Sequence, residues 1–160
     1  MRRLLLIAML CFLPTFLSAQ EITVPVHVDV EGLEPGISKI TYAEFVAKFG
    51  KPDKYEKYES EFGMTEIYDI GGNHFHCEEN GVLYNFRVKD NSLRVLTTYI
   101  KGGIRVGDEF NKLNFLKPKL VKTYPDGLSQ YSIFEDISDD KLVIFVEGGK
   151  IVSMIYTYPV

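Results

Sequence analysis

The chain has 160 residues and a formal net charge of −4, with 18 Lys and Arg against 22 Asp and Glu. This acidic balance argues against a nucleic-acid partner, because binding to phosphates requires a basic surface. Hydrophobic residues make up 46% of the chain, which is ample for a core. Only one of the two cysteines, Cys77, lies beyond the N-terminal apolar stretch, so we expect no internal disulfide.

Residues 1–19 have the pattern of a secretory signal peptide. Two arginines precede an apolar run from Leu4 to Leu17, and Ser18 and Ala19 provide a cleavage site. Pro14 interrupts the run, and no later stretch approaches the roughly 18 to 20 consecutive apolar residues of a membrane helix. The sequence therefore predicts an exported protein, secreted or periplasmic, without a membrane span.

Residues 20–37 are predicted to form an N-terminal edge strand and a loop. Valine occupies every second position from residue 24 to residue 30, which is typical of a half-buried strand. We call these four residues, Val24, Val26, Val28 and Val30, the valine stripe. Pro25 has no amide proton to donate, so the strand is expected at a sheet edge or where pairing begins.

Residues 38–101 begin with the strongest helix signal in the chain. Thr41 and Glu44 have the spacing of a capping box, and Phe45 lies on the predicted apolar face. Gly50 is expected to end the helix. Turn signals near residues 71–73, 80–81 and 90–92 then separate short stretches rich in β-branched and aromatic residues, which predicts an antiparallel meander. Residues 53–62 fit a helix and a charged strand equally well.

Residues 102–160 repeat this order of elements. At an offset of about 66 residues, the stretch from Ile104 to Gly127 again has an apolar segment, a Lys-Pro pair and a tyrosine. Three stretches with hairpin character follow, at residues 128–135, 141–149 and 150–158. We therefore predict an α+β fold: a tandem repeat of a short helix plus a small antiparallel β-meander, with the helices packed on one face of the sheet.

The repeated unit consists of a helix that opens near residues 41–45 or 106–110, a Lys-Pro break at residues 51–52 or 117–118, and a meander. This pattern resembles the β-lactamase-inhibitor-protein-like (BLIP-like) domains and the related SmpA/OmlA-type outer-membrane assembly lipoproteins. The resemblance covers residues 38–160 and implies protein binding rather than catalysis. The inhibitor itself is rich in tryptophan and contains disulfides, whereas this chain has no tryptophan. No contact residues are therefore transferred from it.

One predicted strand contains a candidate metal site. Alternate residues of a strand share a face, so His74, His76 and Glu78 are expected on one side, with Phe75 and Cys77 on the other. Two histidines and a carboxylate can bind Zn²⁺, and the other interpretation is a solvated or partner-facing strand. No nucleophile motif or phosphate-binding loop accompanies them, so we expect neither an enzyme nor a cofactor.

The second half contains a candidate partner surface. At an offset of 68, Phe75 and Cys77 fall on Val143 and Phe145, which predicts a shared core face. The opposite face, polar in the first half, then becomes apolar and needs a cover. It consists of Leu142, Ile144, Val146, Met154 and Tyr156. The valine stripe, the first repeat, a second copy of the chain or another exported protein could each provide that cover.

The sequence thus favours an exported protein-binding module. Its partner is expected to be another exported or envelope protein, or the same protein in a dimer. The alternative function is metal or small-ligand binding on the strand face of His74, His76 and Glu78.

Overall fold

The structure is a computed structural model that describes residues 27–60, 63–134 and 141–157. The predicted signal peptide and the first half of the valine stripe lie outside the described residues. No helix within these three ranges is long and apolar enough to cross a membrane.

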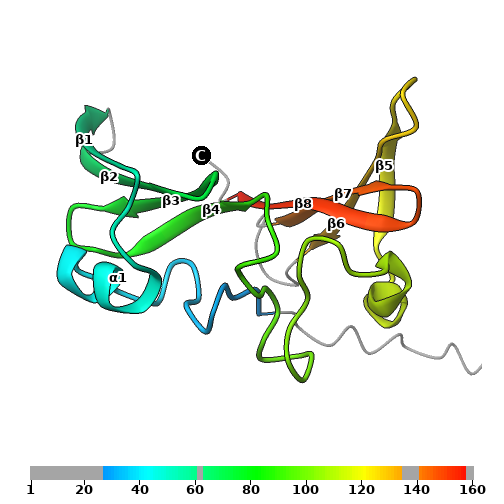
Figure 1. Ribbon diagram of the computed structural model, residues 1–160, viewed down its shortest axis with the longest axis horizontal. Helices are drawn as coiled ribbons and strands as arrows, with labels where there is room; N and C mark the ends of the chain where they lie inside the picture. The colour runs from blue at the N-terminus through cyan, green and yellow to red at the C-terminus, as the bar shows by residue number, and fades with distance from the viewer. Residues whose placement is uncertain (1–26, 61–62, 135–140, 158–160) are drawn as a thin grey trace, which may run out of the picture.

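Eight strands form one antiparallel sheet in the order β1-β2-β3-β4-β8-β7-β6-β5 (Figure 1). Each half of the sheet is a four-stranded meander, and the two halves join where β4 pairs with β8. The strands are β1 (Lys54–Ser60), β2 (Gly63–Ile70), β3 (Asn73–Glu78), β4 (Leu83–Val88), β5 (Lys119–Thr123), β6 (Ser129–Phe134), β7 (Lys141–Glu147) and β8 (Lys150–Thr157). Residues 53–62, whose sequence fits a helix and a charged strand equally well, contain the strand β1.

Only one α-helix, α1 (Tyr42–Phe49), is found in the described part of the chain. The predicted capping box is confirmed: the Thr41 side chain accepts a hydrogen bond from the Glu44 backbone, and the Glu44 side chain accepts one from the Thr41 backbone. Gly50 ends the helix with a φ of 94°, a conformation that glycine adopts without strain. Phe45 is fully buried and stacks on Tyr68 of β2.

The second predicted helix is a 3-10 helix of seven residues, η1 (Phe110–Leu116), without a hydrogen bond from a capping side chain. The prediction of an α+β tandem repeat with helices packed on the sheet was therefore wrong, because the chain has a mainly-β fold built on a single sheet. The first turn of η1 lacks the cap that α1 has. Its N-cap residue, Glu109, makes no capping hydrogen bond, and Gly107, which stands at the position of Thr41, has no side chain to make one.

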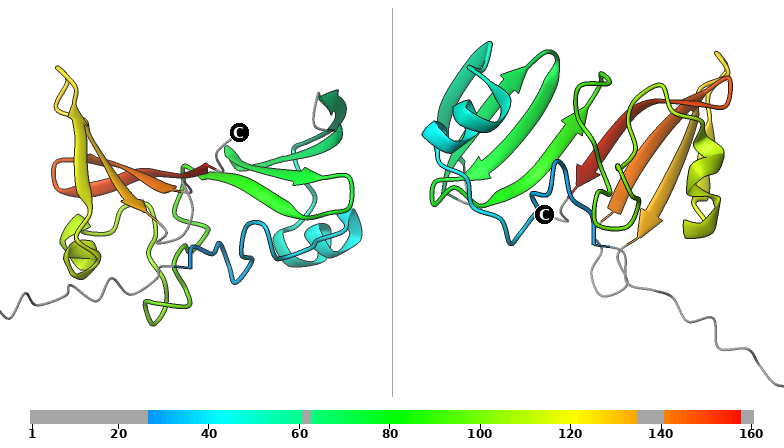
Figure 2. Two further views of the ribbon diagram at one scale, coloured as in Figure 1. Left: turned by 180° about the vertical axis from the view of Figure 1, so that it is seen from behind. Right: turned by 60° about the horizontal axis from the view of Figure 1, so that its bottom comes forward.

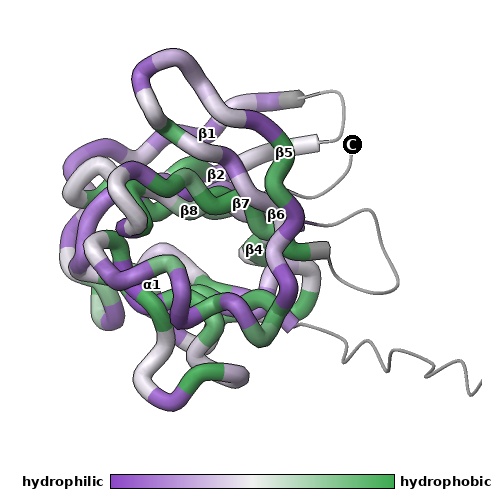
Figure 3. The backbone as a smooth tube through the Cα atoms, turned by 90° about the vertical axis from the view of Figure 1, so that its right-hand side faces the viewer, coloured by the Kyte–Doolittle hydropathy of each residue, from purple (hydrophilic) through white to green (hydrophobic). Residues whose placement is uncertain are grey.

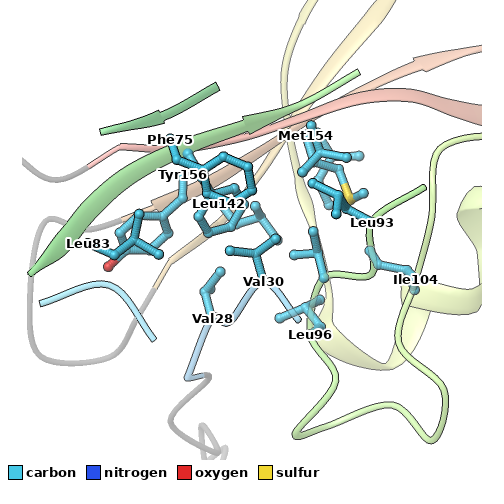
Figure 4. Packing of buried hydrophobic residues seen from close by; sticks show 14 of the residues in the cluster. Val28, Val30, Phe75, Leu83, Leu93, Leu96, Ile104, Leu142, Met154 and Tyr156 are labelled. Carbon is cyan, nitrogen blue, oxygen red and sulfur yellow. The ribbon is translucent and has the colours of Figure 1, made fainter. Parts of the chain in front are cut away.

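The helices and the long connections lie on one side of the sheet, which we call the inner face (Figures 1 and 2). Val28 and Val30 of the valine stripe are 1% and 0% exposed and point toward Leu142 and Tyr156 (Figure 4). The connection after β4 adds the buried residues Leu93, Val95, Leu96 and Ile104. Irregular segments therefore provide much of the cover that the prediction assigned to helices.

Figure 3 looks along the sheet from its β5 end and shows that β7 and β8 are rich in hydrophobic residues and lie across the interior from the covering segments. A single cluster of buried hydrophobic residues extends through both halves of the sheet. In the described part of the chain, no helix or long connection crosses the opposite side of the sheet, which we call the outer face (Figures 1 and 2).

Candidate functional site: the outer face of the sheet

The predicted partner surface lies inside the protein. Its five residues belong to the core cluster on the inner face and are between 0% and 6% exposed. They are Leu142, Ile144, Val146, Met154 and Tyr156. Side chains this deeply buried under the chain's own segments cannot contact a partner in this conformation. A partner-binding surface must therefore lie on another part of the protein.

The wrong assignment comes from an error of one residue in the offset between the two halves. Phe75 of β3 and Ile144 of β7 both lie in the core cluster, which corresponds to an offset of 69 rather than 68. Since side chains alternate between faces along a strand, a slip of one residue moves each of them to the opposite face. Val143 and Phe145, predicted to point inward, therefore lie on the outer face.

One row of paired residues crosses the outer face through all eight strands. Directly paired residues on neighbouring strands point to the same side, with Cβ atoms about 5 Å apart. From β1 to β5 the row consists of Lys54, Asp69, His74, Arg87, Ile155, Val143, Ser132 and Lys119. Its members on β1 to β4 are charged or ionisable. Those on β8 and β7, Ile155 and Val143, are apolar, and those on β6 and β5, Ser132 and Lys119, are polar again. The row is therefore apolar only where it crosses β8 and β7.

The polar half is organised around two histidines. His74 Nδ1 lies 2.5 Å from Asp69 Oδ1 on the neighbouring strand. His76 packs edge-on against Tyr84, with 6.0 Å between the ring centroids. Burial, together with the nearby charge of His74, lowers the pKa of His76. His76 is therefore neutral at pH 7.

The structure places His74, His76 and Glu78 on one side of β3 but does not bring them together as metal ligands. His74 contacts Asp69, and Glu78 accepts a hydrogen bond from Asn80 Nδ2 at 3.0 Å. Among the described residues, no group of three or more His, Cys, Asp and Glu side chains could hold a metal ion. Cys77 lies on the inner face, where burial raises the pKa of its thiol to about 12, so it is not a reactive thiolate.

The centre of the outer face contains an unpaired cation. Arg87 is exposed on β4, between His74 of β3 and Ile155 of β8. Within the described part of the chain, its guanidinium makes no hydrogen bond and no ion pair. Arg87 was not among the site residues predicted from the sequence. It is the only charged residue in the strand sequence LYNFRV, which is a recognisable signal of an outward-facing position.

The apolar half begins directly beside Arg87. Ile155 and Phe145 are half-buried, and Val143 is 7% exposed although it points away from the core cluster. Aromatic residues and arginine are enriched in protein interfaces, which makes this junction the strongest candidate site in the molecule.

Scans of protein-family models, of curated proteins and of solved structures found no match to this chain. The resemblance to BLIP-like and SmpA/OmlA-type domains therefore stays a prediction, and the functional assignment depends on the junction of Arg87 with Val143, Phe145 and Ile155.

Proposed function

We propose that this protein is an exported binding module that docks another exported or envelope protein on the outer face of its sheet. The observation that carries the proposal is the junction of the unpaired Arg87 with the apolar Ile155 of β8, beyond which lie Val143 and the half-buried Phe145 of β7. The opposite, inner face is occupied by the chain's own segments.

The shape of the sheet supports this proposal. Both ends of the sheet, at β1 and at β5, rise on the side away from the helices (Figures 1 and 2). The outer face is therefore concave, and Arg87 and Ile155 lie side by side at its centre, on β4 and β8. A protruding segment of a partner would contact several strands at once, which increases the area it buries.

The charges indicate what kind of partner segment fits. A carboxylate is the group that a guanidinium binds best, because two parallel hydrogen bonds match its planar geometry. Next to Arg87 lies the half-buried Ile155, with Phe145 on the strand beyond it, and both favour an apolar side chain. The partner is therefore expected to present an acidic residue next to an aliphatic or aromatic one. The partner is a different protein or a second copy of the chain.

Affinity purification from the envelope fraction tests this proposal. The tagged wild-type protein is compared with Arg87→Glu and Phe145→Asp, after circular dichroism has shown that both variants remain folded. Ile37→Asp is the matched control, because Ile37 is 68% exposed but lies in the turn before α1. A protein retained by the wild type and by Ile37→Asp, but lost from both outer-face variants, is the expected result. Equal recovery with all four proteins would refute the proposal.

Export is part of the same proposal. If residues 1–19 are a signal peptide, the protein recovered from outside the cytoplasm begins at Gln20. Mass spectrometry of its N-terminal peptide tests this directly, and an intact N-terminus on the exported protein would contradict it.

A further inference from the structure

A pocket of about 610 Å³ lies away from the outer face, at the C-terminal end of α1. Its volume is within the range of about 300 to 1,000 Å³ that is usual for small-molecule sites. Four parts of the chain line it: the N-terminal segment, α1, the turn between β2 and β3, and the connection after β4. The residues are Glu31, Lys48, Phe49, Ile70, Gly71, Asp90, Ser92, Leu93, Arg94 and Arg105.

The pocket combines an apolar surface with basic side chains. Phe49, Ile70 and Leu93 provide its apolar part, and Phe49 and Leu93 extend into the main core cluster. Lys48 and Arg105 are exposed, and neither forms an ion pair within the described part of the chain. Arg105 Nη1 donates to the carbonyl of Asn91 at 2.8 Å, which restrains the position of its guanidinium.

The two acidic residues of the pocket already have partners. Glu31 accepts hydrogen bonds from Arg94 Nε and Nη2 at 3.1 and 2.6 Å. Asp90 accepts them from the backbone and hydroxyl of Ser92 at 2.8 and 2.5 Å. Burial acts to raise both carboxyl pKa values, but these hydrogen bonds outweigh it and leave both lowered. Both groups are therefore ionised and hydrogen-bonded within the chain. The Arg105 guanidinium also helps to lower the pKa of Glu31, but neither it nor the Lys48 ammonium is ion-paired among the described residues, so these two are the cations available to a ligand.

We infer that this pocket binds a small amphipathic carboxylate. Its apolar body lies against Phe49, Ile70 and Leu93, and its carboxylate lies between the Lys48 ammonium and the Arg105 guanidinium. Such a group occurs in a free medium-chain carboxylic acid and at the C-terminus of an apolar peptide. The site is independent of the proposed protein-binding face, because no residue of the pocket lies in the row that crosses the outer face.

Titration with octanoate, followed in ¹H–¹⁵N NMR spectra of the protein, tests the inference. We expect saturable shifts of the Gly71, Ser92 and Leu93 amide signals, and an affinity for the neutral octanol that is about tenfold lower. A second arm compares acetyl-Leu-Phe with its C-terminal amide. Binding of the free peptide in preference to octanoate would identify a peptide C-terminus as the source of the carboxylate, and the reverse would identify a free acid.

Two variants test whether Lys48 and Arg105 provide the positive charge that binds the carboxylate. The double change Lys48→Met and Arg105→Met is expected to weaken octanoate binding about tenfold or more, because it removes both cations. The control is Lys51→Met, which removes an exposed lysine three residues from Lys48 that does not line the pocket. Equal binding of octanoate and octanol, equal affinity of the double variant and the control, or no saturable shift with any carboxylate would each overturn the inference.

Discussion

Asp29 is fully buried, although it alternates with the valines of the valine stripe, between Val28 and Val30. Its carboxylate accepts hydrogen bonds from the backbone of Gly32 and Thr98 and from the hydroxyls of Thr97 and Thr98. These bonds join the N-terminal segment to the connection after β4. Asp29 therefore holds together the two irregular segments that cover the inner face.

Replacing this carboxylate should cost more stability than its size suggests. We expect Asp29→Ala to lower the free energy of unfolding by about 3 kcal/mol, because several buried donors lose their acceptor. Urea unfolding followed by circular dichroism measures the change. Glu59→Ala, which alters an exposed residue of β1, is the control and should leave the transition within about 0.5 kcal/mol of the wild type. Similar midpoints for both variants would contradict the role given to Asp29.

Glu66 gives the inner face a dependence on pH. It lies opposite Lys57, whose ammonium is 2.5 Å from its carboxylate, and it accepts a hydrogen bond from the Tyr68 hydroxyl at 2.5 Å. Burial alone would raise the pKa of Glu66, but the bonds to Lys57 and Tyr68 outweigh it and lower the pKa below its usual 4.5.

A carboxyl whose pKa is lowered by folding stabilises the protein above its unfolded pKa and loses that contribution as pH falls through the folded value. Glu66→Gln should therefore destabilise the protein at pH 7, and the difference from the wild type should shrink as the pH falls below 4.5. Urea unfolding of both proteins at pH 7, 5 and 3 provides the comparison. A difference that stays constant across this range would show that the ionised carboxylate contributes nothing.

At the scale of elements, the two helical segments differ in how their first turns are fixed. α1 has a reciprocal capping box between Thr41 and Glu44, whereas Glu109 before η1 makes no capping hydrogen bond. A 3-10 helix also turns more tightly than an α-helix, so equivalent residues point in different directions. Phe115 is 60% exposed, while Phe49, its counterpart at an offset of 66, packs against the core.

This difference predicts that replacing Thr41 and replacing Glu109 with alanine will affect the stability of the protein unequally. Thr41→Ala should destabilise the protein by about 1 kcal/mol, because the first turn of α1 loses its cap. Glu109→Ala should change the stability by less than about 0.5 kcal/mol, since the only ion pair it forms with a described residue is a 4.0 Å contact with the exposed Lys150. Thermal unfolding of the two variants under one set of conditions makes the comparison. A larger loss for Glu109→Ala would show that η1 is fixed by its N-cap after all.

Across the whole molecule, local signals in the sequence predicted the parts that depend on local chemistry. The cap of α1, the glycine turns and the strands β2 to β4 and β6 to β8 are found where the sequence placed them. The predicted N-terminal edge strand is not: in its described part, from residue 27 on, only isolated bridges form at Val30. The sequence did not predict correctly to which side of the sheet the β7 side chains point, because this depends on the register between the two halves. An error of one residue exchanged the sides of Val143 and Ile144. The cover of the inner face was not predicted in full either, since irregular segments such as residues 89–109 have no periodicity to read.

In the candidate site too, features within one strand were predicted from the sequence, whereas contacts between strands were not. Alternation along β3 correctly predicted that His74 and His76 share a side, but not that His74 would contact Asp69 of the neighbouring strand. The junction of Arg87 with Ile155 arises only where β4 pairs with β8. These two strands lie far apart in the sequence, so no local pattern could bring them together.

Site-specific photocrosslinking in the producing cell tests the central claim, that the outer face binds a protein, most directly. A photoreactive phenylalanine analogue is placed at Phe145 or, as a control, at Ile37. We expect a discrete adduct from position 145 that disappears when Arg87→Glu is added, and no such adduct from position 37. An adduct with the mass of two chains would identify a second copy as the partner. The absence of any adduct at position 145, or an adduct unaffected by Arg87→Glu, would contradict the claim.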